Sequence, residues 1–383
     1  MKSISVQQMR ELDRRTIEEF GTPGCVLMER AGNRVAETML EWCANLAPRH
    51  VKRFVCLAGK GNNGGDAYVI SRYIYDNTDF DVIVYAVCPV GDLPTDARHH
   101  AGLLPDDVPV IIKEQLSGDD FQAGDIIVDG LLGTGISGPL RAPYAQWIAT
   151  VNAVQLPTVA VDMPSGMNGD SGSFETDCVM ADLTVTIGMP KYGLVKDRGP
   201  DYCGQLRMVE IGIPQSYIAE TESQLEMIFA EDVKSFLGRL PMRSYKNIVG
   251  RVLICGGSVE YRGAPLLAAE SALRGGAGMV YLLSAGGRRL PDGLRALISK
   301  HLNLPYLDER AIHELTSLSE VIDAMVCGPG MGRNGACADF VKACGNTGKT
   351  VVYDADALAL IANDFSLLVN SRKAILTPHP GEM

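Results

Sequence analysis

The 383-residue sequence lacks the features expected of a membrane-embedded or nucleic-acid-binding protein. No apolar run approaches the ~20 residues that a membrane-spanning helix needs. Basic residues are too few for a cationic surface, because 46 acidic residues against 35 basic ones give a net charge of -11. The basic footprint typical of nucleic-acid binders is therefore missing, and an anionic membrane surface is a poor partner. We expect neither nucleic acid nor membrane as a partner.

The sequence also lacks the cysteine patterns of zinc and redox sites. Its ten cysteines form no CxxC motif and have no histidine partners at zinc spacing. The N-terminus has no apolar segment of the kind that a secretory signal requires. We therefore expect ten reduced thiols, most of them buried as small hydrophobic residues, in a cytoplasmic protein.

Short β-rich runs that alternate with helical stretches make up most of the chain. Residues 6–43 predict two helices, since Met9, Leu12, Ile17 and Phe20 recur at roughly helical spacing. Strands are then predicted at 54–57, 82–87, 126–128, 158–161 and 183–187. This alternation is typical of an α/β fold, with a mostly parallel sheet covered by helices on both faces.

A polar segment without periodicity, near residues 213–227, predicts a boundary between two domains. We place these domains at residues 1–220 and 221–383. The alternation then restarts, with a helix at 264–274 and strands at 251–255, 279–283, 324–327, 350–353 and 374–376. Because the last strand leads only into a polar loop, where a parallel-sheet unit normally continues, we expect the second domain to be incomplete.

The loop after the first strand carries the most informative motif. Residues 59–66, GKGNNGGD, satisfy the GxGxxG pattern of dinucleotide-binding folds. The pattern is weak alone, because residues 133–138 satisfy it again and a tight turn would use the same glycines. Asn62, Asn63 and Asp66 add three hydrogen-bonding side chains to a backbone that is free to approach a ligand. The loop therefore favours a specific polar ligand over a generic turn.

Further polar residues follow strands that should end at the same edge of the sheet, where α/β proteins bind ligands. Asp129 fits a turn cap and an ion ligand equally well. Together with Asn63 and Ser165 it would offer the oxygen ligands that hard cations prefer. Asp162 is a candidate general acid or base. Lys191 is either an ordinary surface lysine or the partner of Asp162 in acid–base work.

Together these motifs resemble one family, the bifunctional NAD(P)H-hydrate repair enzymes, in which an epimerase is fused to an ADP-dependent (S)-NAD(P)H-hydrate dehydratase. The matching stretches run in order along the chain, at 27–32, 61–66, 129–135, 161–166, 190–194, 256–258, 261–265, 273–278, 328–332, 354–358 and 377–382. The resemblance implies a Rossmann-like three-layer αβα epimerase domain, a ribokinase-like α/β domain and homo-oligomers. The implied substrate is hydrated NADH or NADPH, which carries a hydroxyl at C6 of the nicotinamide ring.

The resemblance also implies roles for individual residues. We expect Asp162 to handle protons at the C6 hydroxyl, with Lys191 as a second catalytic candidate, and K⁺ to bind at Asn63, Asp129 and Ser165. The hydrate would contact Asn62, Asn63, Gly64, Gly65, Asp66, Gly133, Thr134, Gly135, Ile136, Ser137, Gly138, Pro139, Tyr144 and Asp162. In the second domain, Ala264, Gly330 and His379 would form the first half of the hydrate site.

One departure from the family bears on activity. The family's dehydratase has a lysine-containing loop and a GxGD segment at the ADP phosphates, and both would lie beyond Met383. We therefore expect a chain truncated within the dehydratase, with epimerase activity retained and the ADP- or ATP-dependent dehydration lost; Mg²⁺ is a second candidate ion. Two alternatives stay open. One is a non-catalytic nucleotide- or partner-binding protein, and the other is a ribokinase-like small-molecule kinase.

Overall fold

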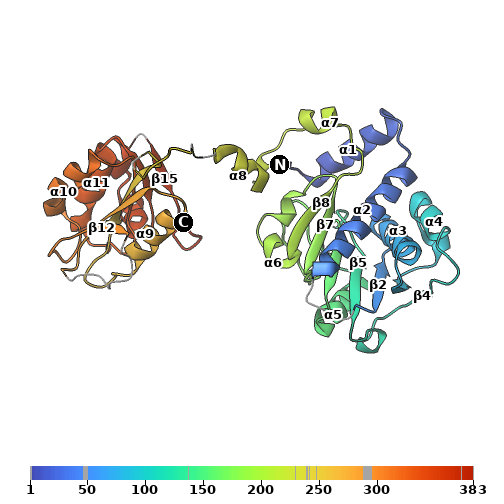
Figure 1. Cartoon of the computed structure of the whole chain (residues 1–383). Helices are drawn as coiled ribbons and strands as arrows, with labels where there is room; N and C mark the ends of the chain where they lie inside the picture. Colours follow the sequence, from blue (N-terminus) through green and yellow to red (C-terminus); the bar gives the residue numbers. More distant parts are fainter. Residues whose placement is uncertain are drawn as a thin grey trace. The chain divides into compact units, whose positions relative to one another are not determined.

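The computed structural model describes residues 2–45, 51–136, 138–228, 230–238, 240, 242–246, 248–287, 296–371 and 373–382. The chain divides into two compact units, Met1–Ser235 and Phe236–Met383. Each unit is built on its own parallel sheet, as Figure 1 shows. Across the described ranges, no helix combines the length and the apolar character that crossing a membrane requires.

The first unit contains a seven-stranded sheet whose neighbouring strands are all parallel. In sheet order the strands are β4 (Val110–Ile112), β3 (Asp81–Ala86), β2 (Arg53–Ala58), β5 (Asp125–Gly130), β6 (Thr158–Val161), β7 (Leu183–Ile187) and β8 (Gln205–Val209). The central strands β5, β6 and β7 are buried along their whole length, which is why they read as continuous apolar runs rather than alternating ones.

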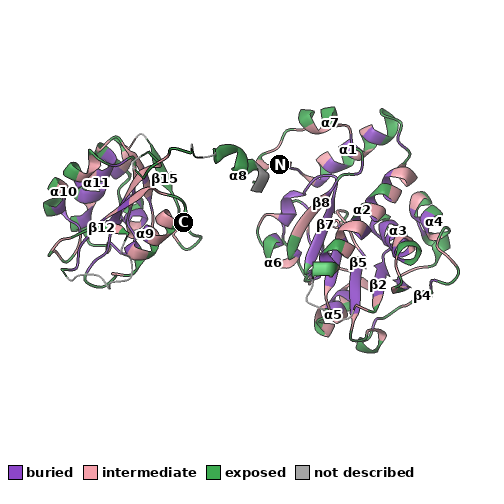
Figure 2. Ribbon diagram, in the orientation of Figure 1, coloured by how far each residue is buried: buried purple, intermediate pink, exposed green. Residues whose placement is uncertain are grey.

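Helices cover both faces of this sheet. Phe54 and Cys56 of β2 pack in the cluster that includes α2 (Gly24–Asn45), α3 (Asn62–Asn77) and α4 (Thr95–Ala101). Val55 and Leu57 face the opposite way, into a cluster with Trp147 and other residues of α5 (Tyr144–Val154). Figure 2 shows the buried strands between helices with exposed outer faces. Successive residues of β2 therefore point to opposite faces of the sheet and contribute to a separate core on each face.

The first helix, α1 (Val6–Glu18), is fixed by its N-terminus. Ser5 caps it through a reciprocal capping box with Gln8. Just before it, Ile4 forms a parallel bridge with Lys191, which follows β7; the Ile4 amide donates to the Pro190 carbonyl at 2.8 Å. Short strand β1 (Lys2–Ser3) pairs with β9 (Leu225–Glu226). The N-terminal segment thus joins the end of β7, and α1 starts there.

The second unit contains a six-stranded parallel sheet. Its order is β12 (Leu297–His301), β11 (Met279–Ser284), β10 (Arg251–Gly256), β13 (Ala324–Cys327), β14 (Thr350–Tyr353) and β15 (Ala374–Leu376). One core packs α9 (Ala264–Arg274) against β10 and β11. The other packs α10 (Ile312–Ser319), α11 (Ala338–Asn346) and α12 (Asp356–Asn363) against the opposite face.

The remaining helices are short. They are α6 (Gly199–Cys203), α7 (Gln215–Glu220), α8 (Ala230–Phe236) and the 3₁₀ turns Val90–Asp92, Gly118–Asp120, Tyr192–Leu194, Glu309–Ala311, Gly335–Cys337 and Phe365–Leu368.

The α/β architecture expected of both domains is confirmed. Each predicted strand lies on an observed one, and α9, β13, β14 and β15 have the predicted bounds. Strands β4, β8 and β12 were not predicted. β4 is apolar but only three residues long, and β8 and β12 mix polar with apolar residues, so none has the longer apolar run of a central strand. Phe20, assigned to the first helix, lies beyond its end and is exposed.

Candidate active site

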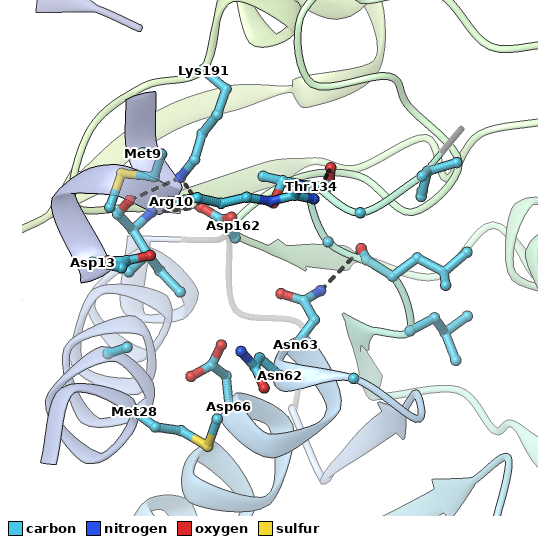
Figure 3. Close-up of a pocket in the computed structure, with 18 of the residues that line it drawn as sticks. Met9, Arg10, Asp13, Met28, Asn62, Asn63, Asp66, Thr134, Asp162 and Lys191 are labelled. Carbon is cyan, nitrogen blue, oxygen red and sulfur yellow. Dashed lines mark hydrogen bonds and ion pairs between the residues drawn. The ribbon is translucent and has the colours of Figure 1, made fainter. Parts of the chain in front are cut away.

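A cavity of about 630 Å³ lies in the first unit, where the loops after β2, β5, β6 and β7 meet α1 and α2 (Figure 3). Of the residues predicted to contact the hydrate, those that line it are Asn62, Asn63, Asp66, Gly133, Thr134, Gly135, Ile136, Gly138, Pro139, Tyr144 and Asp162. Lys191 lines it as well. Ser137 lies outside the described residues. The structure therefore gathers residues that follow four separate strands at one cavity.

Gly64 and Gly65 are not among the residues that line this cavity, and both are closely packed. A Cβ on Gly64 would lie 1.9 Å from the Gly59 carbonyl oxygen, and one on Gly65 would lie 2.5 Å from Met28 Sδ. Gly59 is equally constrained, because its Cβ would be 1.7 Å from the Leu131 carbonyl oxygen. Gly59 thus lets the loops after β2 and β5 touch backbone to backbone, while Gly64 and Gly65 let the start of α3 pack against Gly59 and Met28.

The start of α3 forms one wall. Gly61 is its N-cap residue and offers no side-chain cap, so the first amides of the helix have no capping side chain. Asn62, Asn63 and Asp66 lie in the first turns and line the cavity. A helix N-terminus carries a partial positive charge and suits an anionic or strongly polar ligand group. This wall can therefore bind polar groups with backbone amides and side chains together.

Asp129 lies beneath that wall, fully buried at the end of β5. Its carboxylate accepts from the Ser165 hydroxyl at 2.6 Å, from the Ser165 amide at 2.8 Å and from the Leu131 amide at 3.2 Å. The Leu132 carbonyl accepts from Asn63 Nδ2 and the Ser165 hydroxyl, both at 3.1 Å. Burial raises the pKa of Asp129 to about 6, against hydrogen bonds that lower it. Asn63, Asp129 and Ser165 are thus joined, through the Leu132 carbonyl, in one hydrogen-bond network.

Asp162 and Lys191 form an ion pair at the opposite wall. The Lys191 side chain is 1 % exposed, so the interpretation as a surface lysine is wrong. Lys191 Nζ also donates to the Ile187 carbonyl at 2.8 Å. Asp162 Oδ1, the oxygen paired with lysine, accepts from the Ile187 amide at 2.9 Å and from the Thr186 hydroxyl at 3.3 Å. Every hydrogen bond described for this carboxylate falls on Oδ1, which leaves Oδ2 for a ligand.

The backbone at Asp162 has a φ of 65°, in the left-handed region that a non-glycine residue adopts only at a cost. Such strain persists where the surroundings over-determine the conformation, and it is concentrated at functional sites. Here the surroundings are the lysine, the threonine hydroxyl and the backbone amide that hold Oδ1.

Sequence reasoning missed the contribution of α1. Met9, Arg10 and Asp13 line the cavity, and Arg10 Nη2 lies 3.5 Å from the Thr134 carbonyl oxygen. Burial raises the pKa of Asp13 to about 6, with Lys191 lowering it and Asp162 raising it. The helical spacing predicted the buried face of α1. That spacing does not indicate that α1 lies at the ends of β6 and β7. The position of α1 depends instead on the bridge between Ile4 and Lys191.

In the second unit, the structure brings two of the three predicted hydrate residues together. Ala264 begins α9, and Gly330 has a φ of 62° with a Cβ position 3.3 Å from Ala264 Cβ. That Cβ would also be 2.7 Å from the Tyr261 carbonyl oxygen, so glycine is needed there. His379 lies in the loop after β15, is 69 % exposed and contacts Glu382. These residues follow strands of one sheet, at its carboxyl-end edge.

Comparisons with known proteins agree with this arrangement. Residues 24–193 match the family model of the YjeF-related protein N-terminus, and residues 252–383 match that of NAD(P)H-hydrate dehydratase. The bifunctional NAD(P)H-hydrate repair enzyme of Moorella thermoacetica is 34 % identical over 100 % of this chain and 74 % of its own length. Those of Salinibacter ruber and Coxiella burnetii are each 33 % identical, over 99 % and 98 % of this chain and 74 % of their own lengths.

The chain belongs to the family of bifunctional NAD(P)H-hydrate repair enzymes. Because the dehydratase model matches residues 252–383, the comparisons do not support the expectation of a truncated chain whose dehydratase has been lost.

The backbone contact at Gly59 gives a first prediction. Gly59→Ala should destabilise the first unit by more than about 2 kcal/mol, because its Cβ would meet the Leu131 carbonyl and the loops after β2 and β5 must separate. Gly61→Ala is the matched control two residues away, since nothing lies within 4 Å of its Cβ position; the loss of a glycine N-cap should cost it about 1 kcal/mol at most. Urea unfolding of both variants measures the difference, and equal midpoints would contradict the prediction.

Proposed function

We propose that the first unit interconverts the R and S epimers of hydrated NADH and NADPH at C6 of the nicotinamide ring. Family membership supports the substrate class. The observation that carries the proposal is the Asp162–Lys191 pair, which stands in the wall of a cavity of about 630 Å³. This volume is within the range of small-molecule sites. The opposing wall at the start of α3 supplies amides and polar side chains for the substrate's polar groups.

The chemistry needs only proton handling. The lone pair of the ring nitrogen forms a C=N bond while the C6–O bond breaks, and a protonated acid gives its proton to the departing hydroxyl. The products of this step are a planar iminium ion and water. Water then adds to either face of C6, and its proton passes to a base. Asp162 is the acid–base group in this proposal. Lys191 holds Oδ1 and so directs Oδ2 to the cavity, which makes lysine a positioning residue.

Asp162→Asn tests this assignment. The variant keeps the shape of the side chain and removes its ability to exchange protons, so epimerisation should slow by about 10²–10⁴-fold. The rate is measured by separating the two epimers chromatographically after mixing one of them with protein, with the protein-free rate subtracted. Asp201→Asn, which changes an exposed aspartate of α6, should keep the wild-type rate. A wild-type rate for Asp162→Asn would remove Asp162 from the mechanism.

We propose K⁺ as a ligand of the Asn63, Asp129 and Ser165 network. The donor set fits such an ion, because one buried carboxylate, the Ser165 hydroxyl and the Leu132 carbonyl lie together beside the Asn63 side-chain amide. Mg²⁺ fits less well, since it dehydrates reluctantly and usually keeps several waters, whereas Asp129 and Ser165 are fully buried. When bound, the ion would neutralise Asp129 and stabilise the loop 131–135 at the cavity.

The potassium proposal predicts salt-specific stabilisation. At K⁺ concentrations about 100-fold above the dissociation constant, the first unit should gain about 2.7 kcal/mol relative to choline chloride at equal ionic strength. Thermal unfolding measures the gain. Ser165→Ala should reduce the difference between the two salts, while the control Ser171→Ala, at an exposed serine, should leave it intact. Identical wild-type stability in the two salts would exclude the ion.

We further propose that the second unit contributes the hydrate-binding part of an ADP-dependent dehydratase, built from Ala264, Gly330 and His379. The match of residues 252–383 to the dehydratase model supports this proposal, as does the contact between the positions of Ala264 and Gly330.

The dehydratase proposal predicts that the chain, given the S epimer and ADP, restores the near-ultraviolet absorbance of NADH. Restoration should require ADP and should weaken at least several-fold in His379→Ala, because the ring would no longer contact the hydrate. His313→Ala, at another exposed histidine, is the matched control. If the epimers equilibrate while no absorbance returns, epimerisation stands and the dehydratase proposal fails.

A further inference from the structure

We propose that Asp13 is a proton relay between Asp66 and Asp162, so that protons can be supplied to both faces of the bound nicotinamide ring. This inference rests on the proposed epimerase function and adds Asp66 and Asp13 to the proton chemistry of Asp162.

The three carboxyls reach the cavity from three different elements. Asp13 comes from α1, Asp66 from α3, and Asp162 from the turn after β6. In Figure 3 Asp66 stands on the wall opposite Asp162, and Asp13 lies at the side of the cavity between them. Ile4, just before α1, forms a backbone bridge with Lys191. This bridge fixes the start of α1 and therefore the position of Asp13.

Asp66 is a buried carboxyl with no protein partner in the part of the chain that the structure describes. It is 8 % exposed, and the described residues provide its side chain with no hydrogen bond and no ion pair. A buried carboxyl without a partner is costly, yet this one lines the cavity and points into it. Asp13 likewise has no hydrogen bond or ion pair described for its side chain. Both groups are thus available to a substrate or to water in the cavity.

The pKa values of Asp66 and Asp13 are both raised, but to different extents. Burial, followed by the charges of Asp162 and Asp13, raises the pKa of Asp66 well above its usual range. Burial raises the pKa of Asp13 only to about 6. The raised pKa favours the neutral form of Asp66, while Asp13, with a pKa of about 6, can both accept and release a proton near neutral pH. The other charged groups that line the cavity are Arg10 on α1, Asp96 on α4, Arg141 before α5, and Lys191.

Epimerisation needs such a relay because it transfers a proton from one side of the ring to the other. When the hydroxyl leaves one face, the carboxyl on that side loses a proton as the C6–O bond breaks and the C=N bond forms. When water adds to the other face, its proton goes to the carboxyl on that side. No oxidant or reductant is involved. After one conversion the two carboxyls have exchanged protonation states, and a proton must return before the same epimer can react again.

Asp13 is the group placed to return it. The negative charge of Asp162 raises the pKa of Asp13, and the negative charge of Asp13 raises the pKa of Asp66. Without it, the return would depend on proton exchange with the solvent.

Asp13→Asn tests the relay in the full chain. Steady-state epimerisation should fall by about 10²-fold with little change in KM, and added imidazole should restore it in proportion to its concentration, because a small acid–base molecule can carry the proton. The wild type should not respond to imidazole, and its inflection near pH 6 should be absent from the variant. Asp13→Glu should recover much of the rate. Glu11→Gln, at an exposed position on the same helix, should behave as wild type.

The outcomes separate the two proposals. If the wild type does not equilibrate the epimers faster than the protein-free control, the epimerase proposal fails, and the relay fails with it. If the wild type is active and Asp13→Asn matches it, only the relay is wrong. A slow Asp13→Asn variant that imidazole does not rescue and that keeps the inflection near pH 6 would assign Asp13 a structural role, which also overturns the relay.

Discussion

The burial of the Lys191 ammonium group is the constraint on which the rest of the first unit's site depends. A buried charge is tolerated only with a partner and further hydrogen bonds. Asp162 provides the partner and accepts a left-handed backbone conformation to do so. The Ile187 carbonyl and the Thr186 hydroxyl complete the surroundings of the ammonium group. The backbone of Lys191 also pairs with Ile4, so the residue that fixes Asp162 also fixes where α1 begins.

The opposite wall depends on close backbone contact. The loops after β2 and β5 can touch only because Gly59 carries no side chain near the Leu131 carbonyl. Their contact places Asn63 within hydrogen-bond distance of the Leu132 carbonyl, and Ser165 joins the same carbonyl to Asp129. A buried polar network of this kind stabilises one arrangement only when its members are satisfied. Gly59 and Gly64 of the GxGxxG-like stretch therefore act on packing, and Asn62, Asn63 and Asp66 line the cavity.

This division explains what the sequence could predict. Asp129 lies at the end of β5, Asp162 directly follows β6, and Lys191 comes shortly after β7. The apolar runs of these strands are unmistakable, so parallel-sheet topology alone brings the three residues to one edge. Asp13 precedes the whole sheet in sequence, and its position depends on a single bridge at Ile4 that no periodicity reveals. The burial of Lys191 was equally hidden, because a lysine after a strand is usually solvated. Strand β4 escaped prediction because its apolar run, Val110–Ile112, is only three residues long.

The charges of the cavity also suit the intermediate that the proposed reaction needs. An iminium ion is cationic, and preorganised groups stabilise charge that develops during a reaction most effectively where water is excluded. Lys191 would oppose a cation, but its charge is compensated by Asp162. Asp13 has no such compensation, since no ion pair is described for its side chain, and burial raises the pKa of Asp66, which favours the neutral form of that carboxyl. Ionised Asp13 therefore leaves this part of the cavity with excess negative charge, which favours loss of the C6 hydroxyl from either epimer.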